Sequence, residues 1–297
     1  MTKVVFFGTE YESAMALERL IEKKFDIVAV VTKPDSARGR GRKIDSPAVK
    51  KLAEKYSISV LQPEKLTPDV IASVAKQSSA NTVGILVSYG KIIPQSVIDL
   101  FPHGIINIHP SLLPIYRGPS PVETAILNGG SETGVSIMSL SAGMDSGPVY
   151  IQERITLDGA ETSPTLLEKL VNVGTKLLID NFDEIISGGL KPTMQNESQA
   201  TYCQMIKKSD GSLDPATMTA IECDRRIRAF IAYPKSRLNY RDTDIIVTSA
   251  QVVLEYSGEN WPDIIKCAEN TYLQLKEIVS PTSGKTMKIS DYINGLR

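Results

Sequence analysis

Short apolar runs alternate with amphipathic segments through the first two thirds of the chain, and this alternation limits the possible folds most. Strands are predicted at Val4–Phe7, Ile27–Val31, Thr82–Val87, Ile105–Ile108 and Val135–Met138. The early runs are almost wholly apolar, which is typical of strands buried on both faces. Helices are predicted between them at Ser13–Lys24, Pro47–Tyr56, Val70–Gln77 and Pro94–Leu100. The pattern predicts a doubly wound, Rossmann-like α/β sheet.

The pattern changes after a long predicted helix at Thr162–Ser187. Residues 191–199 are polar and suit a linker. A helix is then predicted at Thr219–Phe230, and short strands follow at Ile245–Val247, Gln251–Glu255, Tyr272–Ile278 and Lys285–Ile289. Short strands between turns favour a small OB-fold-like β-barrel. We therefore predict a catalytic domain over 1–190, a linker over 191–204 and a β-rich domain over 205–297.

Composition sets broad limits on the class of protein. The 297 residues are 42% hydrophobic with a net charge of −1, so any contact with nucleic acid must be local. The cysteines, Cys203, Cys223 and Cys267, are too far apart for a metal cluster or a disulfide framework, and they suit a reducing cytoplasm. The apolar run Val4–Phe7 is too short for a signal peptide or a membrane span. We expect a cytoplasmic monomer with no membrane partner and no metal.

The turn after the first strand gives only a weak nucleotide signal. Gly8-Thr9 is similar to the start of a dinucleotide-binding turn, but the second and third glycines of that motif are missing. Those glycines let the backbone approach a pyrophosphate. Dinucleotide binding is therefore not expected.

An amide and an imidazole stand together at the end of a predicted strand. Asn107 and His109 are two positions apart, so their side chains should project from the same face of the sheet. Pro110 cannot extend the strand, which places His109 at its carboxyl end, where open α/β sheets bind ligands. Asp145 lies in a glycine-rich loop able to turn back toward this edge.

Taken alone, a strand-end Asn-x-His is more often a hydrogen-bonded turn than a catalytic pair, and a lone Asp between glycines is usually turn chemistry. The proline-rich segment from Ser111 to Pro121 changes that balance. It carries Arg117 beside Gly118 and fixes the backbone of a loop, as the wall of a site would.

The chain resembles the 10-formyltetrahydrofolate-dependent formyltransferases in Asn107-x-His109, Ser111-Leu112-Leu113-Pro114-x-x-Arg117-Gly118, Thr133-Gly134-Val135 and Gly143-x-Asp145-x-Gly147. The likeness continues through Phe7-Gly8-Thr9, Lys33-Pro34-Asp35, Tyr89-Gly90-x-Ile92-x-Pro94 and Arg225-x-Ile227-Arg228-Ala229-Phe230. It thus extends almost end to end. Two departures concern the shape of the pocket: Pro148 stands where the family often has Asp, and Pro119-Ser120 replaces a usual pair of alanines.

The resemblance implies transfer of a formyl group from 10-formyltetrahydrofolate, a co-substrate, to an amine. Asn107 would stabilise the oxyanion, His109 would share that role or donate a proton, and Asp145 would keep His109 protonated. The resemblance also implies folate contacts at Ser88, Tyr89, Gly90, Ser111, Leu112, Leu113 and Pro114.

A basic run indicates the amine acceptor. From Lys33 to Lys43, five basic residues against Asp35 give a net charge of +4, although most basic runs of this length are only solvated loops. With the additional β-rich domain, this loop suggests the branch of the family that formylates methionine on initiator methionyl-tRNA. Predicted tRNA contacts are Arg38, Arg40, Arg42, Lys43, Lys207, Lys208 and Arg228, with Arg225 as a further candidate.

Three alternatives stay open at this point. A formyltransferase of the same fold could act on a small amine, such as a nucleotide sugar or glycinamide ribonucleotide, but that function does not explain the basic loop. A non-catalytic RNA-binding protein would have no use for Asp145. A nicotinamide dehydrogenase is disfavoured by the missing glycines.

Overall fold

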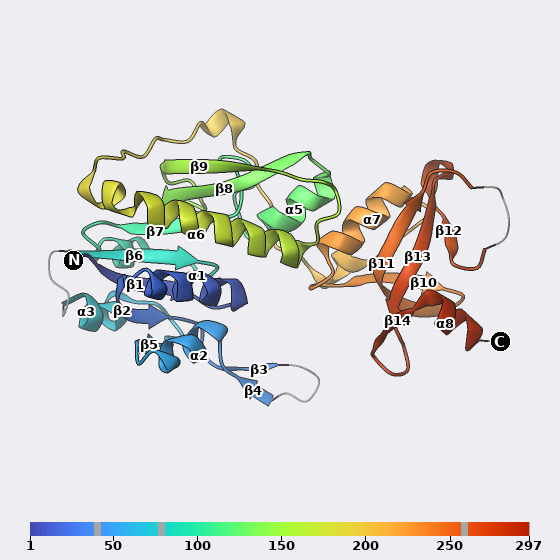
Figure 1. Ribbon diagram of the computed structural model, residues 1–297, viewed down its shortest axis with the longest axis horizontal. Coiled ribbons are helices and arrows are strands. Elements are labelled where there is room, and N and C mark those ends of the chain that lie inside the picture. The colour runs from blue at the N-terminus through green and yellow to red at the C-terminus, as the bar shows by residue number, and fades with distance from the viewer. Residues whose placement is uncertain (39–42, 77–80, 257–260, 297) are drawn as a thin grey trace. The chain divides into compact units, whose positions relative to one another are not determined.

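The computed structural model describes residues 1–38, 43–76, 81–256 and 261–296 (Figure 1). The chain forms two compact units. The first comprises Met1–Pro119, Thr133–Ile155 and Leu167–Cys203, and the second comprises Ser120–Glu132, Thr156–Leu166 and Gln204–Arg297. This division differs from the predicted domains. Residues 120–132 and 156–166 of the predicted catalytic domain group with the second unit, and residues 191–203 of the predicted linker group with the first.

A seven-stranded sheet forms the centre of the first unit in the described residues, in the order β5-β2-β1-β6-β7-β8-β9. Its strands are β1 (Lys3–Gly8), β2 (Asp26–Val31), β5 (Ser59–Leu61), β6 (Thr82–Val87), β7 (Ile105–His109), β8 (Glu132–Ser139) and β9 (Val149–Thr156). The first five are parallel, and β8 runs antiparallel to β7. The predicted Rossmann-like fold is confirmed.

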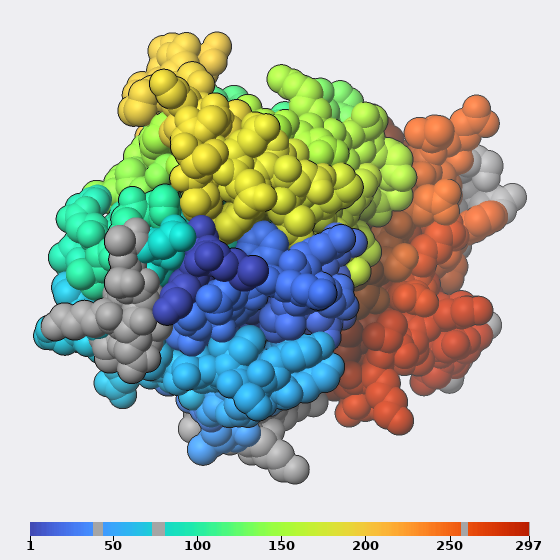
Figure 2. All heavy atoms as spheres, turned by 60° about the vertical axis from the view of Figure 1, so that its left-hand side comes forward, coloured from blue at the N-terminus to red at the C-terminus, as the bar shows by residue number. Residues whose placement is uncertain are grey.

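Helices cover both faces of this sheet (Figure 1). They are α1 (Tyr11–Glu22), α2 (Ala48–Lys55), α3 (Pro68–Lys76), α4 (Gln95–Ile98) and α6 (Ser163–Ser187). The helices α1 and α6 lie side by side, blue and yellow in Figure 2, and Arg19 donates to the carbonyl of Asn172 there at 3.2 Å. On the other face, Ile71 of α3 and Val97 of α4 share a core with Val5 and Phe7 of β1. Among the helices of the described residues, none combines the length and apolar character that a membrane crossing requires.

The second unit contains an antiparallel sheet. Its described strands are β10 (Ser236–Tyr240), β11 (Thr243–Val253), β12 (Ile264–Lys266), β13 (Tyr272–Val279) and β14 (Thr286–Lys288). They pair in the order β10-β11-β13-β12, with β14 also beside β13, and five antiparallel strands are the number in an OB-fold. The helices α7 (Ala220–Ala229) and α8 (Ile289–Asn294) pack on this sheet through Ile227 and Ile293. The helix α7 begins with a capping box, in which Thr219 and Glu222 satisfy each other's backbone N–H groups.

Several elements carry too little sequence signal to predict. The edge strand β9 is half polar and half exposed, so it lacks the apolar run of a buried strand. The helix α5 (Pro121–Asn128) follows directly on the proline-rich loop; Pro121 occupies its first turn, and Gly129 ends it at φ 62°. The two ends of the basic segment expected as a loop pair as short antiparallel strands, β3 (Ser36–Arg38) and β4 (Lys43–Asp45), which we call the basic ribbon.

Tyr89 presents a buried hydroxyl that has no hydrogen-bond partner among the described residues. Its ring packs edge-on against Phe7, with 5.8 Å between centroids. Burial raises the pKa of Tyr89 to about 12. A phenol in an unfolded chain titrates near 10. The unfolded state therefore loses its proton first between about pH 10 and 12, and stability falls as the pH rises through that window.

We expect Tyr89→Phe to be more stable than the parent by about 1 kcal/mol at neutral pH, because the change removes an unsatisfied buried hydroxyl. The advantage should widen from pH 10 to 12. Urea denaturation at several pH values measures both effects, and Tyr11→Phe, at an exposed tyrosine, is the matched control. A variant less stable than the parent would contradict this account.

Candidate active site

Asn107 and His109 occupy the carboxyl end of β7, as the sequence predicts. They are 5% and 4% exposed, and in the neighbouring strands Leu86 pairs with Asn107 and Ser136 pairs with His109. His109 is the last residue of the strand, consistent with Pro110 ending the ladder. The other histidine, His103, lies in a turn, where its Nε2 meets the Asn81 side chain at 2.9 Å.

The imidazole of His109 lies between two oxygen acceptors. Its Nδ1 is 3.8 Å from Oδ1 of Asp145, and its Nε2 is 3.2 Å from the carbonyl oxygen of Tyr116. The Tyr116 carbonyl can only accept, so Nε2 must carry a proton to make this bond. An imidazolium, with N–H on both nitrogens, is the form that serves both oxygens. The separation of 3.8 Å is an ion-pair distance and too long for a direct hydrogen bond.

The amide of Asn107 is available to a ligand. It has no hydrogen-bond partner among the described residues. Unlike the Tyr89 hydroxyl, it is not among the unpaired polar atoms that are fully buried. A neutral amide offers two N–H donors and a carbonyl acceptor. Together, Asn107 and His109 can present N–H groups to an oxygen that gains negative charge.

The loop that carries Asp145 holds it in an uncommon backbone conformation. Asp145 has φ 47° and Tyr116 has φ 59°, both in the left-handed region, which costs of order 1–3 kcal/mol for each such residue. The second oxygen of Asp145 accepts the backbone N–H of Gly118 at 2.8 Å. This bond fixes the carboxylate relative to the proline-rich loop.

Arg117 is the largest fully buried side chain of the described residues, at 1% exposure. Its guanidinium donates to both carboxylate oxygens of Glu197, at 2.7 and 2.9 Å. Glu197 raises the pKa of Arg117 above its ordinary value, and Arg117 lowers that of Glu197. The sequence motif marks Arg117, but nothing local in the sequence identifies Glu197 as its partner.

The predicted folate residues of β6 and its following turn lie at the carboxyl edge of the sheet. Ser88 has φ 46° and Gly90 has φ 71°. The hydroxyl of Thr9 donates to the carbonyl of Tyr89 at 2.8 Å, and that of Ser13 donates to the carbonyl of Val87 at 2.6 Å. These hydroxyls fill the turn after β1, where a dinucleotide-binding fold would need glycine and open space.

The other predicted folate residues hold the loop together. Ser111 donates to the carbonyl of Ile115 at 2.5 Å. The N–H of Leu113 donates to Ser136, and its carbonyl accepts from Gln152 at 2.8 Å. The side chain of Leu112 lies against Gly134, where a Cβ would not fit. Leu113 and Pro114 also line a cavity of about 300 Å³ beside β9. This part of the motif therefore both stabilises the loop and borders a space that a ligand can enter.

The predicted tRNA residues of the N-terminal half are only partly described. Arg38 ends β3 and Lys43 begins β4, so they face each other across the ribbon register. Arg40 and Arg42 lie outside the described residues.

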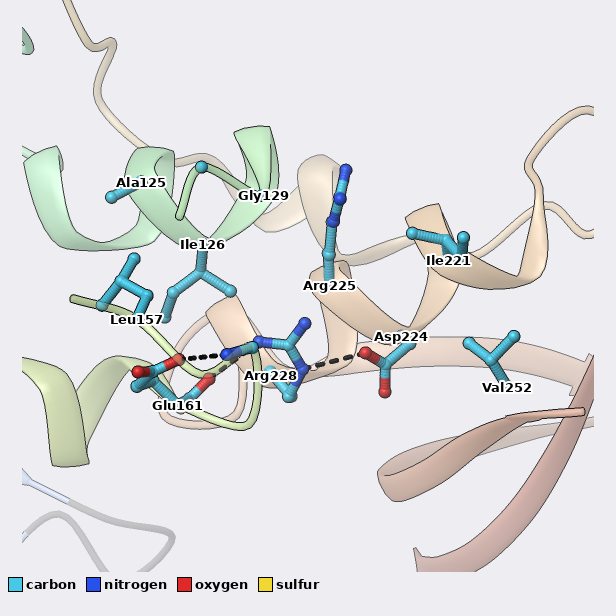
Figure 3. Close-up of a pocket in the computed structure, with 12 residues that line it drawn as sticks. Ala125, Ile126, Gly129, Leu157, Glu161, Ile221, Asp224, Arg225, Arg228 and Val252 are labelled. Carbon is cyan, nitrogen blue, oxygen red and sulfur yellow. Dashed lines mark hydrogen bonds and ion pairs between the residues drawn. The ribbon is translucent and has the colours of Figure 1, made fainter. Parts of the chain in front are cut away.

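In the second unit, Arg228 and Arg225 differ in their contacts. Arg228 Nε meets Asp224 at 2.9 Å, and its Nη1 donates to the carbonyl of Glu161 at 2.9 Å. Figure 3 shows the Arg228 side chain directed between these two residues, whereas Arg225 extends away from both. Arg225 lies over Gly129 at the end of α5 and has no hydrogen-bond or ion-pair partner among the described residues.

Both arginines line a cavity of about 240 Å³ within the second unit (Figure 3). Lys207 and Lys208 are exposed at the start of a 3₁₀ turn of the second unit, before α7 in the sequence. Arg225 is therefore a better candidate for an anionic ligand than Arg228, whose charge is already paired.

The two departures from the family pattern are accommodated locally. The carbonyl of Pro148 accepts the N–H of Ser139 at 2.9 Å. Ser120, next to Pro119, begins α5 and donates its hydroxyl to the carbonyl of Gln204 at 2.6 Å. In the part of the chain that the structure describes, no three His, Cys, Asp or Glu side chains are grouped as metal ligands would be.

The sequence matches two family models, Formyl transferase over residues 2–182 and Formyl transferase, C-terminal domain, over residues 205–297. A methionyl-tRNA formyltransferase of Roseiflexus sp. (strain RS-1) is 33% identical over 99% of this chain and 93% of the relative. One from Kosmotoga olearia is 41% identical over 77% of this chain and 71% of the relative.

Among solved structures, the crystal structure of WlaRD, a sugar 3N-formyl transferase with dTDP and 5-N-formyl-THF, superposes with a TM-score of 0.71. It is 21% identical, and the match covers 93% of this chain and 97% of that one. HypX from Aquifex aeolicus in complex with tetrahydrofolic acid gives a TM-score of 0.66 at 14% identity, over 98% of this chain and 47% of that one. At these identities the likeness shows the fold alone.

The loop geometry predicts a large effect of a methyl group at Gly118. Its φ of 122° is unfavourable for an L-residue, and a Cβ there would lie 2.5 Å from the carbonyl oxygen of Cys203. Gly118→Ala should therefore destabilise the chain by more than the roughly 1 kcal/mol expected from backbone strain alone. Gly188→Ala, at φ 76° with nothing within 4 Å of a Cβ, is the matched control. Equal losses in urea denaturation would show that Gly118 is not crowded.

Proposed function

This chain belongs to the formyl transferase family, and from that premise we propose its reaction and the residues that perform it. The chain transfers the formyl group of 10-formyltetrahydrofolate to the α-amine of methionine on initiator methionyl-tRNA, for the initiation of protein synthesis. The observation that carries the proposed site is the meeting of Asn107, His109 and Asp145 at one edge of the sheet.

The reaction exchanges one amine for another on the formyl carbon. The methionine nitrogen forms a bond to that carbon, the bond from the carbon to N10 of the folate breaks, and a proton passes from the attacking amine to N10. The carbonyl oxygen carries negative charge during the exchange. In our proposal the N–H donors of Asn107 and His109 stabilise this charge, which is the largest contribution that a site of this kind makes.

Asp145 would act on His109 and on the proton. Its carboxylate faces Nδ1 of the ring at an ion-pair distance of 3.8 Å. The gap of 3.8 Å is wide for a direct proton transfer, so a bridging group such as the attacking amine or a water would complete the path. The N–H of Gly118 holds the other oxygen and keeps the carboxylate aimed at the ring.

The folate donor would lie along the carboxyl edge, between the turn at Ser88–Gly90 and the Asp145 loop. Because the Tyr89 side chain is buried in the core and its carbonyl is bonded to Thr9, the neighbouring residues Ser88 and Gly90 would supply the polar groups of this turn to a ligand. Lys33 lies close to Gly90 and has no anionic partner among the described residues. It is a candidate contact for a negatively charged part of the donor.

The tRNA would be held by the basic ribbon and by the second unit. We propose contacts from Arg38 and Lys43 of the ribbon, from Arg40 and Arg42, which stand between them in the sequence, and from Arg225, Lys207 and Lys208 of the second unit. Arg228 was expected as a contact, but its pairing with Asp224 and Glu161 supports a positioning role. We further propose a cytoplasmic monomer, because initiator tRNA is used in the cytoplasm and one chain carries both family domains.

A small amine is the alternative acceptor. The sugar formyltransferase structure shares the fold at 21% identity, whereas relatives named for methionyl-tRNA are 33% and 41% identical. The difference favours the tRNA acceptor. Formylation of methionyl-tRNA, compared with an amino sugar nucleotide and glycinamide ribonucleotide, distinguishes the acceptors directly.

Asn107→Ala should lower turnover by roughly 10²–10³, because it removes one donor to the oxyanion. The Michaelis constants for folate and tRNA should change little, since the donor acts mainly in the transition state. Asn239→Ala, at an exposed asparagine of the second unit, is the control. Near-parental turnover by Asn107→Ala would remove Asn107 from the mechanism.

Arg225→Ala should weaken tRNA binding and lower the slope of log affinity against log salt by about 1, as the loss of one phosphate contact does. Arg228→Ala should instead lower the melting temperature, because it leaves Asp224 unpaired. Binding titrations at several salt concentrations, with thermal melts, measure both. If Arg228→Ala lowered the salt slope and Arg225→Ala did not, Arg228 and not Arg225 would be the phosphate contact.

A further inference from the structure

The segment from Gln195 to Cys203 is bonded to the loop of the candidate site, although its composition suits a linker. The N–H of Arg117 donates to the carbonyl of Thr201 at 2.9 Å, and the N–H of Cys203 donates to the carbonyl of Arg117 at 2.8 Å. The N–H of Thr201 donates to the carbonyl of Pro114 at 3.1 Å. These bonds run along the stretch that supplies the Tyr116 carbonyl to His109.

Arg117 fixes one end of this segment. Beyond its two bonds to Glu197, its Nε donates to Oε1 of Gln195 at 2.9 Å, and its Nη1 donates to the Tyr202 hydroxyl at 3.2 Å. A planar guanidinium with such fork-like contacts has little freedom to turn. Gln195 is therefore held in place through its carbonyl oxygen.

The amide nitrogen of Gln195 is directed at the loop that carries the catalytic carboxylate. It donates to the carbonyl of Asp145 at 2.8 Å and to the carbonyl of Gly147 at 2.7 Å. The three bonds of this one amide thus join the buried Arg117 to two backbone carbonyls of the loop, those of Asp145 and Gly147. Asp145 has a positive φ, a conformation that persists only where surrounding contacts impose it.

We propose that Gln195 is a positioning residue for formyl transfer: with Arg117 it holds the backbone of Asp145 in the conformation that aims the carboxylate at Nδ1 of His109. This inference rests on the proposed function of Asp145. It assigns part of the catalytic support to a segment far from the family's strand-end motif. Gln195 fixes the backbone of Asp145, whereas the N–H of Gly118 fixes its side chain.

Gln195→Ala removes all three bonds, and Gln195→Glu keeps the shape and the bond from Arg117 but loses both donors. The carboxylate of Gln195→Glu would also face two carbonyl oxygens. We expect each variant to lower kcat by about 10–100-fold, with less than a 2-fold change in KM for either substrate. The pH profile of kcat should change as well, because a displaced Asp145 carboxylate would no longer face the ring that takes part in the proton transfer. If Gln195 only stabilised the fold, its variants would have a lower melting temperature, but the molecules that remain folded would keep the parental pH profile of kcat.

Gln251→Ala is the matched control, since Gln251 is an exposed glutamine of β11, outside the cavity that Leu113 and Pro114 line. It should keep parental kcat and pH profile. If Gln195→Ala does not fold, the isosteric Gln195→Glu carries the test. Parental kcat and pH profile in a folded Gln195 variant would overturn the inference while leaving the reaction intact. Failure of the parent chain to formylate methionyl-tRNA would instead overturn the proposed function.

Discussion

The pairing of the buried Arg117 guanidinium is the interaction on which the arrangement of the candidate site depends. A cation at 1% exposure needs partners that satisfy its charge and its N–H groups. Those partners, Gln195, Glu197 and Tyr202, stand 78 to 85 residues further along the chain. The chain must therefore return to the proline-rich loop, and in doing so it closes the loop around His109. The pair is only partly enclosed, because Glu197 is 68% exposed, so its main effect is orientation.

The sequence was most informative where physical patterns are local. Apolar runs located the buried strands, and strand alternation with Pro110 placed Asn107 and His109 at one edge. The approach of Asp145 followed from its glycine-rich loop and the family motif. The edge strand β9 and the 195–203 segment escaped prediction because their polar residues are satisfied by distant partners that no periodicity reveals. Arg228 illustrates a missed local signal, since Asp224 stands four residues before it on the same helix.

In the proposed assignment, different parts of the chain provide the catalytic groups and the contacts to the acceptor. The proposed oxyanion donors and the carboxylate lie in the first unit, and chemistry of this kind would serve any primary amine. The contacts proposed for tRNA lie in the basic segment and in the second unit, where Arg228 is hydrogen-bonded to Asp224 and Arg225 has no hydrogen-bond or ion-pair partner among the described residues. A change of acceptor would therefore leave Asn107 and His109 in place and act on these cationic residues.

The central claim is that His109 is held between the Tyr116 carbonyl and the Asp145 carboxylate. Nitrogen-15 NMR of histidine-labelled protein tests it most directly, because the chain has only two histidines, and His103 serves as an internal reference. We expect Nε2 of His109 to carry the proton of the neutral ring, because it donates to the Tyr116 carbonyl, and Nδ1 to face Asp145. A neutral form protonated on Nδ1 with Nε2 bare would contradict it, because a lone pair would then face the Tyr116 carbonyl.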